Sequence, residues 1–218
     1  TQVVSSFYQP VIIYDHIKDV IIPVTPDNPG NPGHPIDSDP NDQDPKRPVW
    51  PAGTDKASLS KDVTEHITYT GLPKTPDEVT HVLQFTGSGY LDKVTGKWTD
   101  KDGNVLKDQT KPEITWTLEK KQEDKGKFSS VASPSEEGYD VVSITVGNQT
   151  FEKDTADYSK YMDGTTVKNI DNIDHNHANI HIIVNYAKIE QNAKLTVIDE
   201  DDVREAEPNG HLLREYNA

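Results

Sequence analysis

Eight of the fifteen prolines lie between residues 26 and 51, and this cluster limits what the chain can fold into. The spacing is three residues from Pro26 to Pro35, which matches one turn of polyproline II. Acidic residues between Asp37 and Asp44 keep the segment in water. We expect a semi-rigid spacer that reaches at most on the order of 80 Å, with a disordered loop as the alternative.

The rest of the composition favours strands. Val and Ile together number 35 against 9 Leu, and with 20 Thr the β-branched residues make up a quarter of the chain. The apolar fraction is only 32%, so part of the chain must be extended linker. We therefore expect a β-rich protein.

Charge and residue usage exclude several functions. With 22 Lys+Arg against 37 Asp+Glu, the net charge of -15 repels nucleic acid. The absence of cysteine excludes disulfides, Cys-ligated zinc and thiol catalysis. No nucleophile elbow or phosphate loop stands out, so no catalytic residue and no enzyme are expected. No apolar run reaches the roughly 20 residues that cross a bilayer, so membrane insertion is not expected. The start at Thr1 suggests a monomeric fragment of a longer protein.

Alternating apolar residues predict the strands. Val63, Ile67 and Tyr69 share one face, Val79, Leu83 and Phe85 share another, and residues 71–77 form the loop between the two runs. Further strands are expected at Val11–Tyr14, Val20–Ile22, Gly89–Val94, Ile114–Leu118, Val141–Val146, Ile180–Tyr186 and Ala193–Ile198. A short helix fits Thr155–Met162.

These patterns divide the chain into four parts. Residues 1–25 read as the end of a preceding module and residues 26–53 as the Pro/Asp-rich linker. Residues 54–190 form one domain of usual size, and residues 191–218 begin another module.

Several runs match the motifs of one family of repeats. The residues from Val20 to Ile36 are similar to the linker of those repeats. The run Trp50–Thr64 matches the opening W-P-x-G-T-D-K-x-S-L-x-K-x-V-T of their second module. Further similar residues are Phe85-Thr86, Asp92–Lys97, Ser133-Pro134 and Gly138-Tyr139. Together these runs resemble the mucus-binding repeats of lactobacillar surface adhesins, from which residues 97–127 depart by a longer spacing.

The resemblance implies a β-rich α+β fold, with a β-grasp (ubiquitin-like) core, in an elongated array of modules. It implies a repeat of a Gram-positive cell-surface protein whose cell-wall anchor lies outside this fragment. The implied partners are host mucin glycoproteins, bound weakly by each repeat and strongly in tandem. A stalk that only spaces other domains, and a binder of host immunoglobulin or another host protein, are the alternatives.

Aromatic residues are the candidates for contact with glycans. Trp50 is expected where the linker packs on its domain, and Trp116 falls in a core pattern. Trp98 lies in a turn rich in Lys and Asp and is expected to be exposed, so Trp98 and Tyr90 are the candidates for a stacking surface.

No metal site is expected. His175, His177 and His181 are the nearest approach to one, with Asp171 and Asp174 beside them, but exposed histidines in a polar turn need no metal. In Asp100–Asn104 the glycine comes too early for an EF-hand, and a turn built on Asp-Gly explains the run more simply. Calcium at an acidic turn, including Asp199–Asp202, stays open as the one cofactor alternative.

Overall fold

The computed structural model describes residues 21–37, 45–119, 126–190, 194–199 and 211–217, and most regular structure in them is β. The longest strands are β2 (Ser60–Thr70), β3 (Val79–Asp92), β7 (Tyr139–Val146) and β11 (Ile180–Lys188). The shorter ones are β1 (Ile21–Val24), β4 (Lys97–Thr99), β5 (Thr115–Leu118), β6 (Val131–Ala132), β8 (Gln149–Glu152), β9 (Met162–Asp163), β10 (Thr166–Val167), β12 (Lys194–Asp199) and β13 (His211–Asn217). The described residues hold one helix turn, α1 (Tyr158–Tyr161). The expectation of a β-rich protein is confirmed, whereas a β-grasp core stays a prediction.

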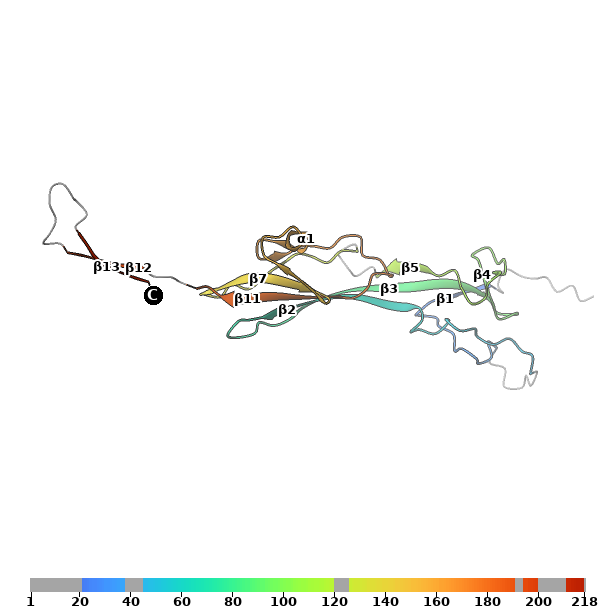
Figure 1. The fold of residues 1–218 in the computed structure, drawn as a ribbon. Coiled ribbons are helices and arrows are strands. Elements are labelled where there is room, and N and C mark those ends of the chain that lie inside the picture. The colour runs from blue at the N-terminus through green and yellow to red at the C-terminus, as the bar shows by residue number, and fades with distance from the viewer. Residues whose placement is uncertain (1–20, 38–44, 120–125, 191–193, 200–210, 218) are drawn as a thin grey trace, which may run out of the picture. The chain divides into compact units, whose positions relative to one another are not determined.

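The strands form three sheets. The main sheet has the order β1-β3-β2-β11-β7-β8, with β4 and β5 also paired to β3. A small sheet has the order β6-β10-β9, and β12 pairs with β13 as a separate hairpin. Strand β7 lies antiparallel between β11 and β8, as the ribbon in Figure 1 shows for β7 and β11. A bulge at Asn185/Tyr186 shifts the β11 register against β7.

The chain divides into two compact units. Unit 1 comprises residues 1–65, 80–129 and 169–179, and unit 2 comprises residues 66–79, 130–168 and 180–218. The division falls inside β2 after Glu65 and inside β3 before Thr80.

One core cluster of unit 1 forms around Trp98. Val24, Leu59, Leu91 and Trp98 are buried together, with Trp50 packed against them. Trp98 fits because β3 carries glycine at position 89, where an added Cβ would lie 2.9 Å from the indole ring. Covering a strand glycine with an aromatic ring is a known way to stabilise a sheet. Strand β1 contributes Val24 to this core and pairs with Gly89–Asp92 of β3, so residues 21–24 form part of unit 1.

The proline segment is not an extended spacer, and this expectation is wrong for the residues that the structure describes. Residues 30–36 and 48–54 fold back antiparallel: Gly33 and Ile36 donate to the carbonyls of Trp50 and Pro48, and Trp50 donates to His34. The fold-back is held by packing at Gly30, where a Cβ would lie 2.4 Å from the Trp50 ring. The indole thus fixes a segment that its composition alone marks as solvated.

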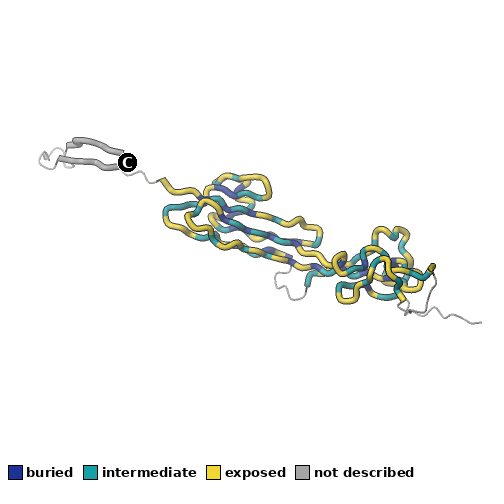
Figure 2. Tube along the Cα trace, turned by 90° about the horizontal axis from the view of Figure 1, so that it is seen from below, coloured by how far each residue is buried: buried dark blue, intermediate teal, exposed yellow. Residues whose placement is uncertain are grey.

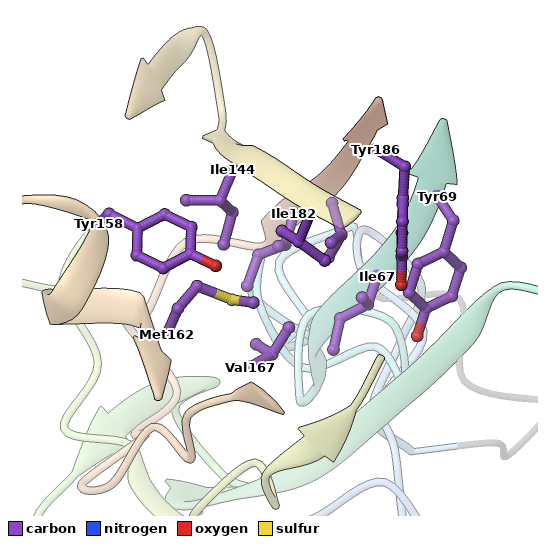
Figure 3. Packing of buried hydrophobic residues seen from close by; sticks show 10 residues of the cluster. Ile67, Tyr69, Ile144, Tyr158, Met162, Val167, Ile182 and Tyr186 are labelled. Atoms are coloured by element: carbon purple, nitrogen blue, oxygen red, sulfur yellow. The ribbon is translucent and has the colours of Figure 1, made fainter. Parts of the chain in front are cut away.

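The core cluster of unit 2 joins the main sheet to the small sheet. Ten buried residues pack together, among them Ile67, Ile144 and Val184 from β2, β7 and β11. Figure 3 shows Tyr69 and Tyr186 side by side at one end of this cluster, with Tyr158 and Met162 at the other. The phenol of Tyr186 donates to the Pro134 carbonyl at 2.6 Å, so its buried oxygen is satisfied.

The alternation of apolar and polar residues along the chain correctly predicted most of the long strands. The faces predicted for β2, β3 and β11 are buried, and Figure 2 shows buried and exposed residues alternating along the tube. The run Gly89–Val94 was expected as a separate strand but continues β3 to Asp92. The expected short helix is confirmed as α1, which covers only Tyr158–Tyr161 of the expected range. The Tyr158 amide, at its first residue, donates to the Thr155 hydroxyl.

Other expectations are not decided by the structure. The strand expected at Val11–Tyr14 lies outside the described residues. The module boundaries at residues 25, 53 and 190 stay predictions. Among the described residues, no helix is long and apolar enough to cross a membrane.

Candidate ligand-binding groove

A groove of about 510 Å³, with a lining that is part polar and part apolar, lies in unit 1 beside the β3–β5 pair. Its walls come from four stretches of chain: the turn after β1, the start of β2, the middle of β3, and the end of β5 with the residue after it. The register places Phe85–Ser88 of β3 opposite Thr115–Leu118 of β5. The pairing of β3 with β5 therefore brings residues more than 30 positions apart to one surface.

Hydroxyl groups form much of the lining. They belong to Thr25, Ser60, Thr86, Ser88 and Thr117. The Ser60 hydroxyl donates to the Lys56 carbonyl at 2.8 Å, and those of Thr86 and Ser88 donate to carbonyls of β5 over longer distances of 3.4 and 3.5 Å. Because these protons point to the backbone, the oxygens are left to accept hydrogen bonds from a ligand.

Four charged residues line the groove. Three are carboxylates, Asp27, Asp62 and Glu119, and one is the ammonium of Lys56. Within the described part of the chain, none of the four takes part in an ion pair. The three carboxylates against one ammonium make the groove net negative, and their oxygens can only accept hydrogen bonds.

The floor of the groove is supported by aromatic rings. Phe85 is 6% exposed and its ring meets His175 edge-on at 6.4 Å. His175 in turn stacks on Trp116 at 5.0 Å, and Trp116 lies opposite Gly87 in the β3–β5 register. An added Cβ at Gly87 would come within 2.7 Å of Ile114 and 3.3 Å of Trp116, so the glycine lets β5 lie close. This packing holds the polar lining in place.

The aromatic residues predicted to contact glycans lie elsewhere. Trp98 is 1% exposed, so the expected exposure is wrong and the indole cannot stack on a sugar. The cause is Gly89, over which the ring folds into the core. Tyr90 is 38% exposed. Its neighbour Leu91 pairs with Trp98, so Tyr90 faces the opposite side of β3 from Leu91 and from Trp98. The two candidates therefore do not form one surface, and neither lines the groove.

The histidines and acidic turns have partners in the protein. His175 stacks on Trp116, and His181 shares a hydrogen bond of 3.1 Å with Thr68. Among the described residues, no group of three His, Asp or Glu side chains is placed to hold a metal ion. Asp100 accepts from the side-chain amide of Asn104 and from the backbone amides of Asn104 and Asp102, which lowers its pKa and closes the Asp-Gly turn. Of the acidic run expected at Asp199–Asp202, residues 200–202 lie outside the described residues.

One buried carboxylate was missed from the sequence. Glu65 lies on the core face of β2 between Val63 and Ile67 and is fully buried. Its Oε2 shares a 2.7 Å hydrogen bond with His81 Nδ1, whereas Oε1 has no partner among the described residues. Burial raises the pKa of Glu65, and the bond to His81 opposes that shift. The signal in the sequence was a glutamate at an apolar position of an alternating strand.

Comparison with known proteins identifies the family. Residues 54–168, more than half of the chain, match the model of the Muc B2-like domain. Among solved structures, the chain is similar to the crystal structure of Mub-RV, with 22% identity and a TM-score of 0.38 over 60% of this chain and 54% of that one. The chain thus spans about half the length of that structure. No curated protein matches this chain. The match over residues 54–168 confirms the resemblance stated from the sequence, and the chain belongs to the Muc B2-like domain family.

Proposed function

We propose that this chain is a repeat of a bacterial surface adhesin that binds mucin-type glycoproteins, weakly through each repeat and strongly in tandem. The observation that carries the proposal is the family match over residues 54–168. Most of the groove lining, from Lys56 to Glu119, falls inside the matched region. The proposal does not depend on Trp98, which is buried.

The form of the groove suits weak binding. It is partly open, and its lining offers hydroxyl and carboxylate oxygens beside apolar surface of about the same extent. A partly open site encloses less of its ligand than a closed pocket does, so a single copy is expected to release its ligand readily. Linking copies raises the effective concentration of the second site, by which weak modules gain strong attachment.

The setting of this function is the surface of a Gram-positive, Lactobacillus-like cell. The repeat is proposed to belong to an array of β-grasp modules attached to the cell wall by a signal outside these residues. Binding, not catalysis, is the proposed role, and no cofactor is required for it, with calcium at an acidic turn as the alternative.

The test is retention of mucin on beads that carry the chain. Beads with one copy, beads with a tandem repeat and beads with an unrelated acidic β domain are compared at equal surface density. We expect the tandem repeat to hold mucin better than the unrelated domain and the single copy to hold it weakly. Equal retention on all three would sink the proposal and favour a stalk that only spaces other domains. The same beads with immunoglobulin test the remaining alternative.

A further inference from the structure

We infer that the groove beside β3 and β5 selects neutral sugars, such as hexose and N-acetylhexosamine residues, over sialylated or sulfated ones. This inference rests on the proposed function and goes further, because it assigns a surface and a ligand chemistry. The surface is the groove lined by Ser60, Asp62, Thr86, Ser88 and Glu119, together with Lys56.

The first argument is the balance of donors and acceptors. Asp62 and Glu119 can only accept hydrogen bonds when ionised. Ser60, Thr86 and Ser88 donate to backbone carbonyls and are left with acceptor oxygens. A ligand that fits such a lining must bring donors, and each hydroxyl or amide of a neutral sugar brings one.

The second argument is charge. The carboxylate of a sialate, or a sulfate group, is an anion that meets three carboxylates in this groove against the single ammonium of Lys56. The local field therefore opposes an anionic sugar end, and the net charge of -15 of the whole chain adds to that field. Selection against the charged glycan follows from this repulsion, because neutral and charged glycans both bring hydroxyl donors.

The third argument separates sugar from a basic peptide, which acidic grooves also attract. Lys56 stands inside the lining and repels a cationic side chain. Neutral polar side chains outnumber the acids in the groove; they belong to Thr25, Ser60, Gln84, Thr86, Ser88 and Thr117. A lining with several hydroxyl oxygens suits the many hydroxyls of a hexose better than the single charged end of a long side chain.

The experiment uses the whole chain and three fractions of O-glycans released from mucin: neutral, sialylated and sulfated, each immobilised at equal density. Four proteins are compared: the natural chain, Asp62→Asn, Glu119→Gln and the control Glu113→Gln, an exposed acid that does not line this groove. Thermal unfolding of all four confirms that they are folded. Retention on intact mucin is measured in parallel for each.

We expect the natural chain and Glu113→Gln to bind the neutral fraction more strongly than the other two. Asp62→Asn and Glu119→Gln should each lower binding of the neutral fraction about tenfold, because each replaces a charged acceptor. The inference is overturned if the sialylated or sulfated fraction binds best, or if the two groove variants bind the neutral fraction as the natural chain does. In either case retention on intact mucin shows separately whether the proposed function still stands.

Discussion

Glu65 Oε2 and His81 Nδ1 share a 2.7 Å hydrogen bond in the core of unit 1, and the Glu65 side chain is only 1% exposed. His81 also stacks on Phe128, with ring centroids 6.0 Å apart, which holds the imidazole against the carboxyl group. The pair thus places an ionisable group where β2 otherwise presents Val63 and Ile67.

This pair predicts a pH dependence of stability. Burial raises the pKa of Glu65 above its ordinary value of 4.5, so above that pH the folded state keeps a proton that the unfolded chain releases. The contribution of Glu65 to the free energy of unfolding is therefore full below about pH 4.5 and is lost as pH rises through the raised pKa. Glu65→Gln removes the titration, so its stability relative to the natural chain should increase between pH 4 and pH 7.

Urea unfolding at a series of pH values measures this difference. The exposed acid Glu113 provides the control, because Glu113→Gln makes the same chemical change without the burial. A difference between Glu65→Gln and the natural chain that is the same at pH 4 and pH 7 would contradict the account of Glu65.

Trp98 should matter for stability and not for direct sugar contact. The indole is 1% exposed and belongs to the unit 1 core, so Trp98→Ala should lower the free energy of unfolding by about 3–5 kcal/mol. Tyr90→Ala, at a 38% exposed position, should lower it by less than about 1 kcal/mol. Denaturant unfolding of both variants checks this, and equal losses for the two would argue against the burial of Trp98.

Gly30 should not tolerate a side chain. A Cβ there would lie 2.4 Å from the Trp50 ring and 2.5 Å from Thr54 Oγ1, so Gly30→Ala must displace the indole or the loop. We expect a loss of about 1–3 kcal/mol in the free energy of unfolding and a change in Trp50 fluorescence. Asn31→Ala, at the exposed neighbour, is the control and should change neither. A Gly30→Ala variant as stable as the control would mean that residues 30–36 do not pack on Trp50.

Adhesion to mucin should strengthen in mild acid. Mucins are anionic, and the chain carries a net charge of -15 at pH 7, so their long-range fields repel. Acid makes the net charge of the chain less negative, because the chain takes up protons as the pH falls, and this weakens the repulsion. Retention on mucin at pH 5 and pH 7.4 in matched salt tests this, and equal retention would count against it.

Much of the fold could be predicted because its long strands alternate. In β2 and β11 every second residue along much of the strand is apolar and faces the core, and this alternation is visible in the sequence itself. Strands of two to four residues, such as β6 or β10, have no periodicity to read. Their pairing depends on contacts between residues far apart in the chain, as between Val131 and Val167.

The wrong predictions for Trp98 and for the proline segment also arise from contacts between residues far apart in the chain. Trp98 stands between Lys97 and Thr99, which favours an exposed turn, yet Gly89 on another strand leaves room for its ring. Two glycines at alternate positions of β3, Gly87 and Gly89, were the signal that aromatic rings would cover that strand. The proline segment likewise folds back because Trp50 packs on Gly30, a contact that proline spacing does not reveal.

The candidate groove could not be predicted from local sequence at all. Its lining comes from four stretches between Thr25 and Glu119, and each stretch alone reads as ordinary solvated surface. The register of β3 against β5 brings two of these stretches together.

The most direct test of the central claim is the rate at which the protein leaves a mucin surface as its copy number rises. Proteins of one, two and three linked copies pass over immobilised mucin, and dissociation is followed in buffer. If each copy is a weak mucin-binding site, dissociation should slow steeply with each added copy, with a total gain in affinity on the order of 10²–10⁴. Dissociation that is equally fast for one, two and three copies, or no binding by any of them, would contradict the claim.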